Sequence, residues 1–251
     1  MSTPTITLII DGVSYNCTPI APPPPPPAFG LFLLPSGVTP TIYSLDSLAN
    51  WIGVKDSSAS GTAVGTTAYP VSVGGRTNAR EFTSTFTGNG GFRWSVTYDN
   101  DTASDHFIYA GDLYFTSVAG LAQMELDNNQ VTADGKTYIF GCQANAADGK
   151  WDVTKAVTGS QWVATSAPGN PQTFPLSQWL HFEIYAYRDN AGNITYSAIY
   201  FNGTTYQIGV KLPAAESLGW AIGTLLVNFQ IGGSGSGAVT AYASGLEVAK
   251  W

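Results

Sequence analysis

The chain has 251 residues, of which 13% are aromatic and only 11% charged, and it includes 28 glycines and 15 prolines. This composition suits many short strands joined by tight turns rather than charged amphipathic helices. The formal net charge of −7 argues against a nucleic-acid partner, because binding to phosphates needs clustered lysine and arginine. No apolar run approaches the ~20 residues of a membrane helix, so we expect no membrane span.

The first elements in chain order are two short strands at 6–10 and 13–17, which flank an Asp11-Gly12 turn. An Asp-Gly pair between apolar runs is a strong hairpin signal. Residues 22–27 are six consecutive prolines, which form an extended spacer. The segment preceding the main body therefore has two interpretations, an anchoring or assembly arm made by residues 1–28 or an ordinary linker.

These signals predict three parts, with a hairpin arm at 1–20, a Pro-rich linker at 21–40 and the main domain at 41–251. The amino terminus has neither a basic region nor a long apolar stretch, so no signal peptide is expected. A function outside the cell or on a particle surface, which we favour, would then depend on lysis or another export route. Cys17 and Cys142 are the two cysteines, and they imply no disulfide framework.

Beyond residue 41, alternation of apolar and polar residues predicts one strand after another. The clearest segments are 92–98, 180–185, 195–201 ending at an Asn202-Gly203 turn, 225–231, 239–243 and 246–248, with a flexible Gly-rich loop at 232–237. Turn signals recur every few residues, and no convincing amphipathic helix interrupts them. The prediction is an all-β, two-sheet antiparallel jelly-roll sandwich, preceded by the hairpin arm and the polyproline linker.

A series of short motifs carries a family resemblance, covering most clearly residues 107–251. It includes Glu125-Leu-Asp127-Asn-Asn-Gln130, Gly135-Lys-Thr-Tyr-Ile-Phe-Gly-Cys-Gln143, Gly149-Lys-Trp151-Asp-Val153, Gln161-Trp162, Gln178-Trp179-Leu-His181 and the closing Leu246-Glu-Val-Ala-Lys-Trp251. In order and chemistry the chain resembles the concanavalin A-like lectin/glucanase superfamily, in particular uncharacterised bacterial jelly-roll proteins. The resemblance implies the fold more than an activity, because this sandwich hosts lectins, hydrolases, lyases and structural modules.

Strand alternation predicts which polar residues share one sheet face. We expect a polar face that binds carbohydrate, with aromatic rings stacking on the sugars as the resemblance implies. Its members are Glu125, Asp127, Gln143, His181, Glu183, Tyr185, Asn228 and Gln230, with Trp151 and Trp162, and also Trp179, as stacking candidates. Trp51, Trp94, Trp220 and Trp251 are expected to be core residues, and Cys142 a small buried one.

The resemblance also raises a catalytic hypothesis. Laminarinase-like members carry Glu-x-Asp-x-x-Glu, with carboxylates as nucleophile and acid/base, where this chain has Glu125, Asp127 and Gln130. Gln130 cannot donate and retake a proton, so this alignment predicts no retaining hydrolysis. A weaker alternative is a polysaccharide lyase that uses His181 or Tyr185 as base, with residues such as Arg76, Arg80 and Gln230. No catalytic residue and no cofactor is therefore predicted; Glu125 and Asp127 alternatively hold a Ca²⁺ ion or form a solvated face.

Two functions from different classes follow. The first is a non-catalytic, lectin-like surface module that binds a polysaccharide or glycan and is displayed through its N-terminal arm. The second is a structural or decoration subunit of a virion or extracellular filament, in which residues 1–28 drive self-assembly or attachment. A polysaccharide lyase or glycosidase ranks last.

Overall fold

The computed structural model describes residues 6–10, 13–17, 31–154 and 162–251. The chain divides into two compact units, residues 1–30 and 31–251. In the first unit, β1 (Ile6–Ile10) and β2 (Val13–Cys17) pair antiparallel, with Ile10 opposite Val13. The six-proline segment lies outside the described residues, whereas 31–40 of the predicted linker belong to the second unit.

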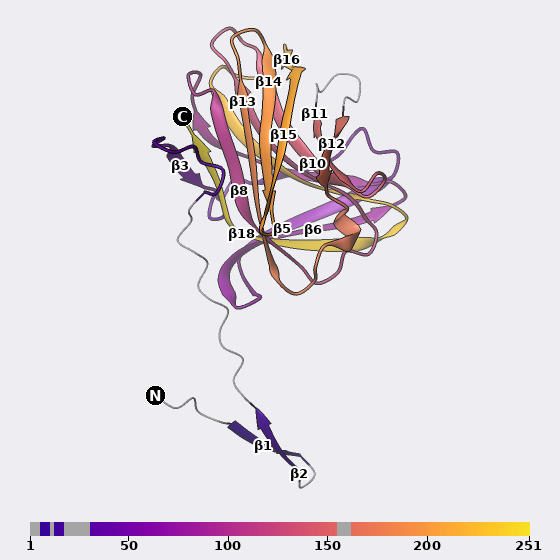
Figure 1. The fold of residues 1–251 in the computed structure, drawn as a ribbon. Helices are drawn as coiled ribbons and strands as arrows, with labels where there is room; N and C mark the ends of the chain where they lie inside the picture. The colour runs from indigo at the N-terminus through magenta and orange to yellow at the C-terminus, as the bar shows by residue number, and fades with distance from the viewer. Residues whose placement is uncertain (1–5, 11–12, 18–30, 155–161) are drawn as a thin grey trace. The chain divides into compact units, whose positions relative to one another are not determined.

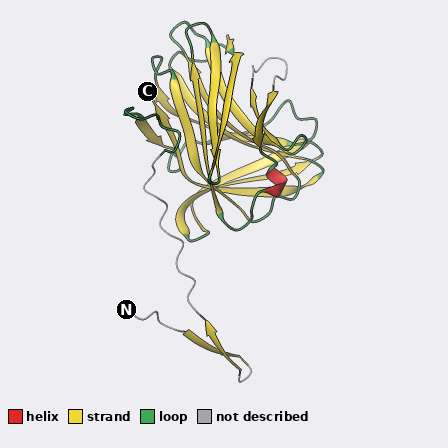
Figure 2. Ribbon diagram, viewed as in Figure 1, coloured by secondary structure: helices red, strands yellow, loops and turns green. Residues whose placement is uncertain are grey.

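The described residues of the second unit form two antiparallel sheets of eight strands each (Figures 1 and 2). Sheet 1 runs in the order β12 (Trp162–Pro168), β11 (Lys150–Thr154), β10 (Thr137–Asn145), β9 (Leu121–Val131), β17 (Thr224–Gly233), β7 (Gly91–Asn100) and β4 (Ile52–Lys55), and β16 (Ala215–Glu216) joins it along β10. Sheet 2 runs in the order β15 (Thr204–Pro213), β14 (Asn193–Phe201), β13 (Trp179–Arg188), β8 (His106–Phe115), β18 (Ser236–Lys250), β6 (Arg76–Thr87) and β5 (Thr62–Val73), and β3 (Thr41–Ser44) joins it along β18.

The predicted fold class, an all-β two-sheet sandwich, is confirmed. Within the described ranges the helical content is one 3₁₀ turn, η1 (Pro171–Thr173), and no helix there is long and apolar enough to span a membrane. The predicted Asn202-Gly203 turn joins β14 to β15. Both of its residues have positive φ, as a two-residue hairpin turn of type I′ requires.

One predicted loop is wrong. Residues 232–237 are not a flexible connection, because β17 continues to Gly233 and β18 begins at Ser236. Gly233 is extended against β9, and a Cβ at this position would lie 2.3 Å from the ring of Phe86. Glycine here allows the backbone to approach an aromatic ring closely. Glycine-rich composition alone predicts a flexible loop instead.

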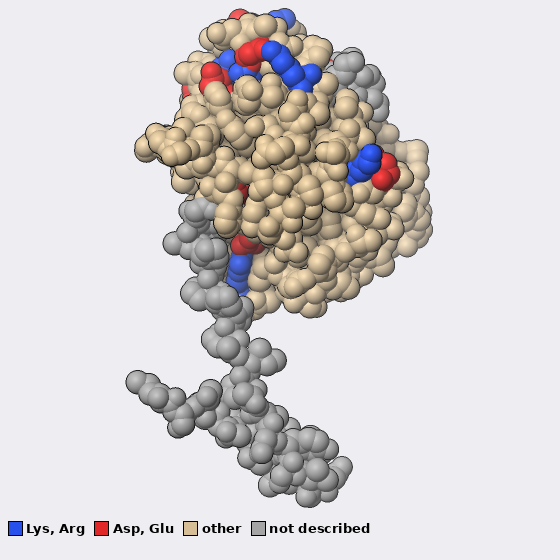
Figure 3. Space-filling view, in the orientation of Figure 1, with Lys and Arg blue, Asp and Glu red and all other residues tan. Residues whose placement is uncertain are grey.

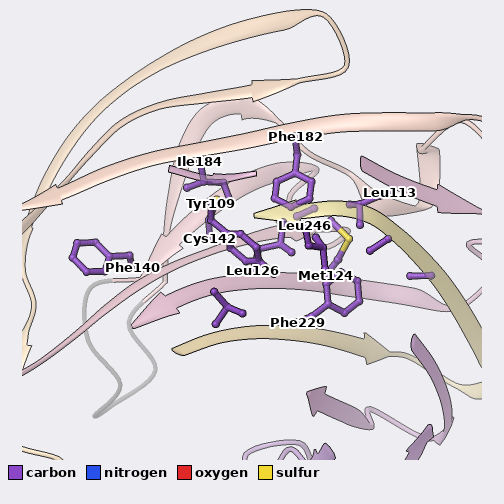
Figure 4. Packing of buried hydrophobic residues seen from close by; sticks show 14 of the residues in the cluster. Tyr109, Leu113, Met124, Leu126, Phe140, Cys142, Phe182, Ile184, Phe229 and Leu246 are labelled. Carbon is purple, nitrogen blue, oxygen red and sulfur yellow. The ribbon is translucent and has the colours of Figure 1, made fainter. Parts of the chain in front are cut away.

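The core lies between the inner faces of the two sheets (Figure 4). Met124, Leu126 and Phe229 project from sheet 1 toward Phe182 and Leu246 of sheet 2, and all five are fully buried. Burying each such side chain stabilises the fold by about 1.5–3 kcal/mol. Cys142 belongs to this core as predicted and is a free thiol. The outward positions of the same strands are therefore the ones left to carry function.

Candidate functional site

The outer surface of sheet 1 carries the residues that the sequence placed on one polar face. On β9 the alternation buries Met124 and Leu126 and turns Glu125 and Asp127 outward. The strand register aligns their neighbours: Glu125 lies between Gln143 of β10 and Gln230 of β17, and Asp127 lies beside Asn228 of β17. These five predicted residues, together with Arg93, Ser95 and Asp152 on flanking strands, are called the polar face below.

Hydrogen bonds between side chains run across the strands of the polar face. Gln230 Nε2 donates to Glu125 Oε2 at 3.1 Å, and Asn228 Nδ2 donates to Asp127 Oδ2 at 3.1 Å. On the flanking strands Ser95 Oγ donates to Asn228 Oδ1 at 2.6 Å, and Gln143 Nε2 donates to Asp152 Oδ2 at 3.0 Å. These bonds fix the orientation of each amide, so the face offers donors and acceptors in set positions.

Exposure divides the polar face into a floor and a rim. Asp127, Gln143, Asp152, Asn228 and Gln230 are buried and form the floor. Glu125, Arg93 and Ser95 are half-buried and form the rim that a ligand can reach. Arg93 Nε is itself buried and has no hydrogen-bond partner among the described residues, so a ligand reaches other atoms of this side chain.

Burial raises the pKa of Glu125 well above its ordinary value, and the neighbouring Asp127 raises it further, while Arg93 opposes both effects. Burial also raises the pKa of Asp127, against the hydrogen bonds from Glu125 and Asn228. Both carboxyl groups are therefore harder to ionise than in solution, and ionising one makes ionising the other more costly. The pair therefore offers a ligand both an O–H donor and carboxylate acceptors.

Gln130 does not share this face, which corrects the alignment with a catalytic Glu-x-Asp-x-x-Glu motif. The β9–β10 register is continuous from Gln123 to Val131, so alternation turns Gln130 to the side opposite Glu125. Its Nε2 donates to the carbonyl of Ser104 at 2.8 Å and its Oε1 accepts from Arg188 Nε at 2.7 Å. Position 130 would reach the outer face only through a bulge, and β9 has none between these residues.

His181, Glu183 and Tyr185 are on the other sheet, which corrects the expectation of one shared face. They point outward from β13 in sheet 2, away from the polar face of sheet 1. Alternation correctly predicted that they oppose Phe182 and Ile184. It does not say to which sheet a strand belongs, because strand pairing is decided by contacts far apart in the sequence.

On sheet 2 these residues belong to a connected set of charges. Arg76 Nη1 and His181 Nδ1 each donate to Asp112 at 2.7 Å, and His181 Nε2 donates to Glu183 Oε1 at 3.1 Å. Glu183, which is fully buried, also accepts from the backbone N–H groups of Phe32 at 2.7 Å and Leu33 at 2.8 Å. Glu183 therefore secures residues 31–34, a segment we call the strap, and is not available to a sugar.

The charges of sheet 2 predict how stability depends on pH. Burial opposes protonation of His181, but hydrogen bonds to Asp112 and Glu183 outweigh it and raise the pKa to about 9. Burial raises the pKa of Glu247 to about 7, with help from the negative charge of Glu183, and burial raises the pKa of Asp46 to about 7. In each case the folded protein binds its proton more tightly than the unfolded chain does.

We therefore expect the melting temperature to fall as the pH rises from 5 to 9.5. The contributions of Glu247 and Asp46 are complete below their ordinary values near 4.5 and 3.8 and are lost by about pH 7. The contribution of His181 is complete below about 6.5 and is lost as the pH rises through about 9. Differential scanning fluorimetry across this range checks the slope, and His181→Gln should remove its upper part. A melting temperature that rises toward pH 9 would contradict the assignment.

The tryptophans differ from the prediction at three positions. Trp151, predicted to stack on a ligand, is fully buried and lies against Phe201 and Phe174 with ring centroids 5.5 and 6.4 Å away. Trp220, predicted to be in the core, is exposed. Trp51 and Trp94 are buried as predicted, whereas Trp251 is only half-buried.

Trp162 is the predicted stacking residue that lies on the outer surface of sheet 1 in the structure. It pairs with Thr154, which lies next to Gly141 and Asp127 on the outer side. Trp162 is half-buried at the edge of the polar face. The other candidates, Trp179 and Tyr185, are on sheet 2. The guanidinium of Arg76 lies 4.1 Å from the ring centroid of Trp179, and Tyr185 packs against the same buried residues as the strap, Ile108, Ala110 and Ala249.

The residue set considered for a lyase does not converge on one site. Arg80 is buried and donates from Nε to the Asp46 carbonyl at 2.8 Å and from Nη2 to the Leu48 carbonyl at 2.9 Å. It holds a loop, while Arg76 is paired with Asp112. Gln230 belongs to sheet 1 and His181 to sheet 2, so they face opposite sides of the sandwich. In the described part of the chain no group of three or more His, Cys, Asp or Glu side chains is arranged to hold a metal ion.

Sequence reasoning missed several residues of the site. Arg93 and Ser95 alternate with Phe92 and Trp94, and Asp152 alternates with Trp151, so the pattern that found Glu125 contains them too. Asp56 has no such signal. It lies in the loop that follows β4, outside any alternating strand pattern. Its contact with the polar face is the hydrogen bond that its Oδ2 accepts from Gln230 Nε2 at 3.4 Å.

Beside the polar face is a pocket of about 410 Å³. Its lining includes Asp56, Ser58, Asn89, Gln123, Asn145 and Gly232. Asn145 also donates from Nδ2 to Asp152 Oδ2 at 2.8 Å. The pocket and the polar face are therefore continuous through shared side chains.

Comparison with known proteins gives matches among solved structures. No protein-family model matches the sequence, and no curated protein matches it either.

A structure of a carbohydrate-binding module from the β-sandwich super family is 10% identical, covering 80% of this chain and 57% of that chain with a TM-score of 0.43. A family 11 carbohydrate-binding module from Clostridium thermocellum is 10% identical over 82% of this chain and 94% of that chain, with a TM-score of 0.39. The β-glucanase of Bacillus licheniformis is 10% identical over 85% and 98%, with a TM-score of 0.40. The resemblance to the concanavalin A-like lectin/glucanase superfamily stays a prediction from the sequence, whereas the two-sheet antiparallel sandwich is shown by the strand pairing of the chain itself.

Proposed function

We propose that the polar face of sheet 1 binds a glycan without cleaving it. Sugars present many hydroxyl groups, each of which both donates and accepts, and amide and carboxyl side chains match both roles. The polar face supplies such groups from neighbouring strands in fixed orientations, with Glu125 and Arg93 reachable at its rim. The observation that supports the proposal best is this row of hydrogen-bonded amides and carboxyls on one outward surface.

Trp162 adds the apolar part of such a site. A half-buried indole at the edge of a polar surface can stack on the ring of a sugar while the hydroxyl groups meet the polar face. Charged residues are few on the side of the molecule seen in Figure 3, and only 11% of all residues are charged. Low charge suits an uncharged polymer, because little long-range attraction is needed or supplied.

The proposal is tested by replacing Gln230 with Leu. Leucine keeps the side-chain size but removes the amide that donates to Glu125 and Asp56. Glu125, which a ligand can reach, then loses its fixed orientation, so we expect glycan affinity to fall by about tenfold. A glycan array identifies a ligand, and calorimetry measures its Kd. The matched control is Gln207→Leu, the same substitution at an exposed position of β15 on sheet 2.

Unchanged melting temperatures establish that both variants are folded. Equal affinities of Gln230→Leu and the parent protein would place the site elsewhere. Release of shorter sugars from the bound polymer would show cleavage and contradict a purely binding role.

A further inference from the structure

The pocket beside the polar face is closed on its far side by loops tied to one another. Asp56 N donates to the Gly91 carbonyl at 2.9 Å, and Gly61 N donates to the Asn89 carbonyl at 2.9 Å, which joins the loop after β4 to the turn before β7. Gly233 N donates to the Gly90 carbonyl at 2.7 Å, so this wall is also fixed to β17. A chain lying along the polar face meets a rigid wall at this end.

The depth of the pocket comes from glycines. Gln123 of β9 lies opposite Gly232 of β17, which lies opposite Gly91 of β7, so two neighbouring strands have no side chain on this part of the face. A Cβ at Gly232 would come within 3.3 Å of Gln123, and one at Gly91 within 3.0 Å of Asp56. Any larger residue at either position would fill the space. Gly232, which the sequence predicts to belong to a flexible loop, thus gives the pocket part of its depth.

The lining defines the chemistry of an occupant. It consists of serine hydroxyls, side-chain amides, glycines and three alanines with one carboxylate, Asp56, and contains no lysine or arginine. Asp56 is held in place, because its Oδ1 accepts from the backbone N and the Oγ of Ser58. A uronate or sialate would bring a negative charge next to this carboxylate without a cation to balance it. A neutral sugar meets hydrogen-bond donors and acceptors together with small apolar side chains.

We propose that this pocket takes the neutral sugar unit at one end of the glycan, so that the protein selects chain ends rather than the middle of a polymer. The inference rests on the proposed function, since the rest of the chain would lie along the polar face. A volume of about 410 Å³ is within the range of pockets that enclose small ligands, roughly 300–1,000 Å³. Gln123 and Asn145 join the two parts, being two residues from Glu125 and Gln143 on the same faces of β9 and β10.

The test compares intact neutral polysaccharides, such as glucans, xylans, galactans and mannans, with their own tri- to hexasaccharide fragments. Selection of chain ends predicts that binding capacity per unit mass rises in proportion to the number of ends, and that uronate- or sialate-terminated oligosaccharides do not bind. Gly232→Val should weaken binding of the best fragment at least tenfold by filling the pocket. Ser60→Trp, a change at an exposed lining residue, should do the same without touching the sheet.

The control is Gly237→Val, the same substitution on β18, where the nearest atoms to a new Cβ are 3.8 Å away. Binding per mass that does not depend on chain length, or full affinity in both Gly232→Val and Ser60→Trp, would overturn the chain-end inference while leaving the polar face as the binding site. Binding of acidic glycans alone would overturn the neutral pocket. Failure of every glycan to bind the parent protein would overturn the proposed function itself.

Discussion

Replacing Trp151 with Ala is expected to lower the free energy of unfolding by about 3–5 kcal/mol, the usual cost of removing a large aromatic side chain from a core. The indole is fully buried between the sheets and packs against Phe201 and Phe174. Its removal leaves a cavity that the surrounding strands cannot close. Urea unfolding followed by fluorescence measures the loss.

Trp162→Ala is the matched variant, because it removes the same side chain from the outer surface. We expect it to change stability by about 1 kcal/mol or less and to weaken glycan binding by about 1–3 kcal/mol, the range found for stacking on aromatic rings. The two substitutions thus separate packing from binding. A stable Trp151→Ala that has lost binding, or an unstable Trp162→Ala, would reverse the assignments.

Trp151→Phe distinguishes packing from hydrogen bonding at the same position. Trp151 Nε1 is buried without a hydrogen-bond partner among the described residues, a cost that the indole imposes on the fold. Phenylalanine keeps most of the apolar contact and removes that cost. The loss in stability should therefore be well below that of Trp151→Ala.

The position of Trp151 could have been predicted from its neighbours. In the strand Lys150–Thr154, Trp151 shares its face with Val153, and an apolar pair on alternate positions indicates the core side. The alternation of this strand therefore places Trp151 in the core, against the prediction that it stacks on a ligand. Local pattern was sufficient here, as it was for Glu125 and Asp127.

The division of the site between sheets could not be predicted in this way. Alternation finds outward polar residues equally well on β9 and on β13, but sheet membership depends on which strands pair. Glu183 illustrates the limit, because its backbone partners are Phe32 and Leu33, about 150 residues earlier in the chain. The pocket depends in the same way on loops after β4 and before β7 that are tied together only in the folded chain.

The strap leads to the second large prediction, the effect of Glu183→Ala. Glu183 is the carboxylate to which protonated His181 and the backbone of Phe32 and Leu33 donate. Removing Glu183 leaves the backbone N–H groups of Phe32 and Leu33 without this acceptor and takes one of two carboxylates from His181, which keeps Asp112. Breaking a buried network of charges and hydrogen bonds in this way costs about 3–5 kcal/mol. We expect a loss of that size in urea unfolding at pH 6, where His181 is protonated.

The matched control is Lys211→Ala, which breaks the ion pair of Lys211 with Asp189 at 2.7 Å on the exposed surface of the same sheet and leaves the hydrogen bonds of Asp189 to the turn in place. Exposed pairs contribute about 0–1 kcal/mol, so this variant should be nearly as stable as the parent. The contrast tests whether burial, rather than the presence of a salt bridge, determines the effect. Similar losses in both variants would show that Glu183 is not shielded from solvent as the structure has it.

Loss of the strap should also be visible at the surface it covers. Leu31, Leu33 and Leu34 pack on Ile108, Ala110 and Ala249, which are fully buried. In Glu183→Ala the two backbone N–H groups lose their acceptor, so the segment should open more often and chymotrypsin should cut after Phe32 or the neighbouring leucines faster than in the parent. Because opening bares the apolar patch of sheet 2, the variant should also self-associate as its concentration rises, which light scattering detects. Cleavage at the parent rate would contradict this role of Glu183. It would mean that the apolar contacts of the three leucines are sufficient to hold the strap in place.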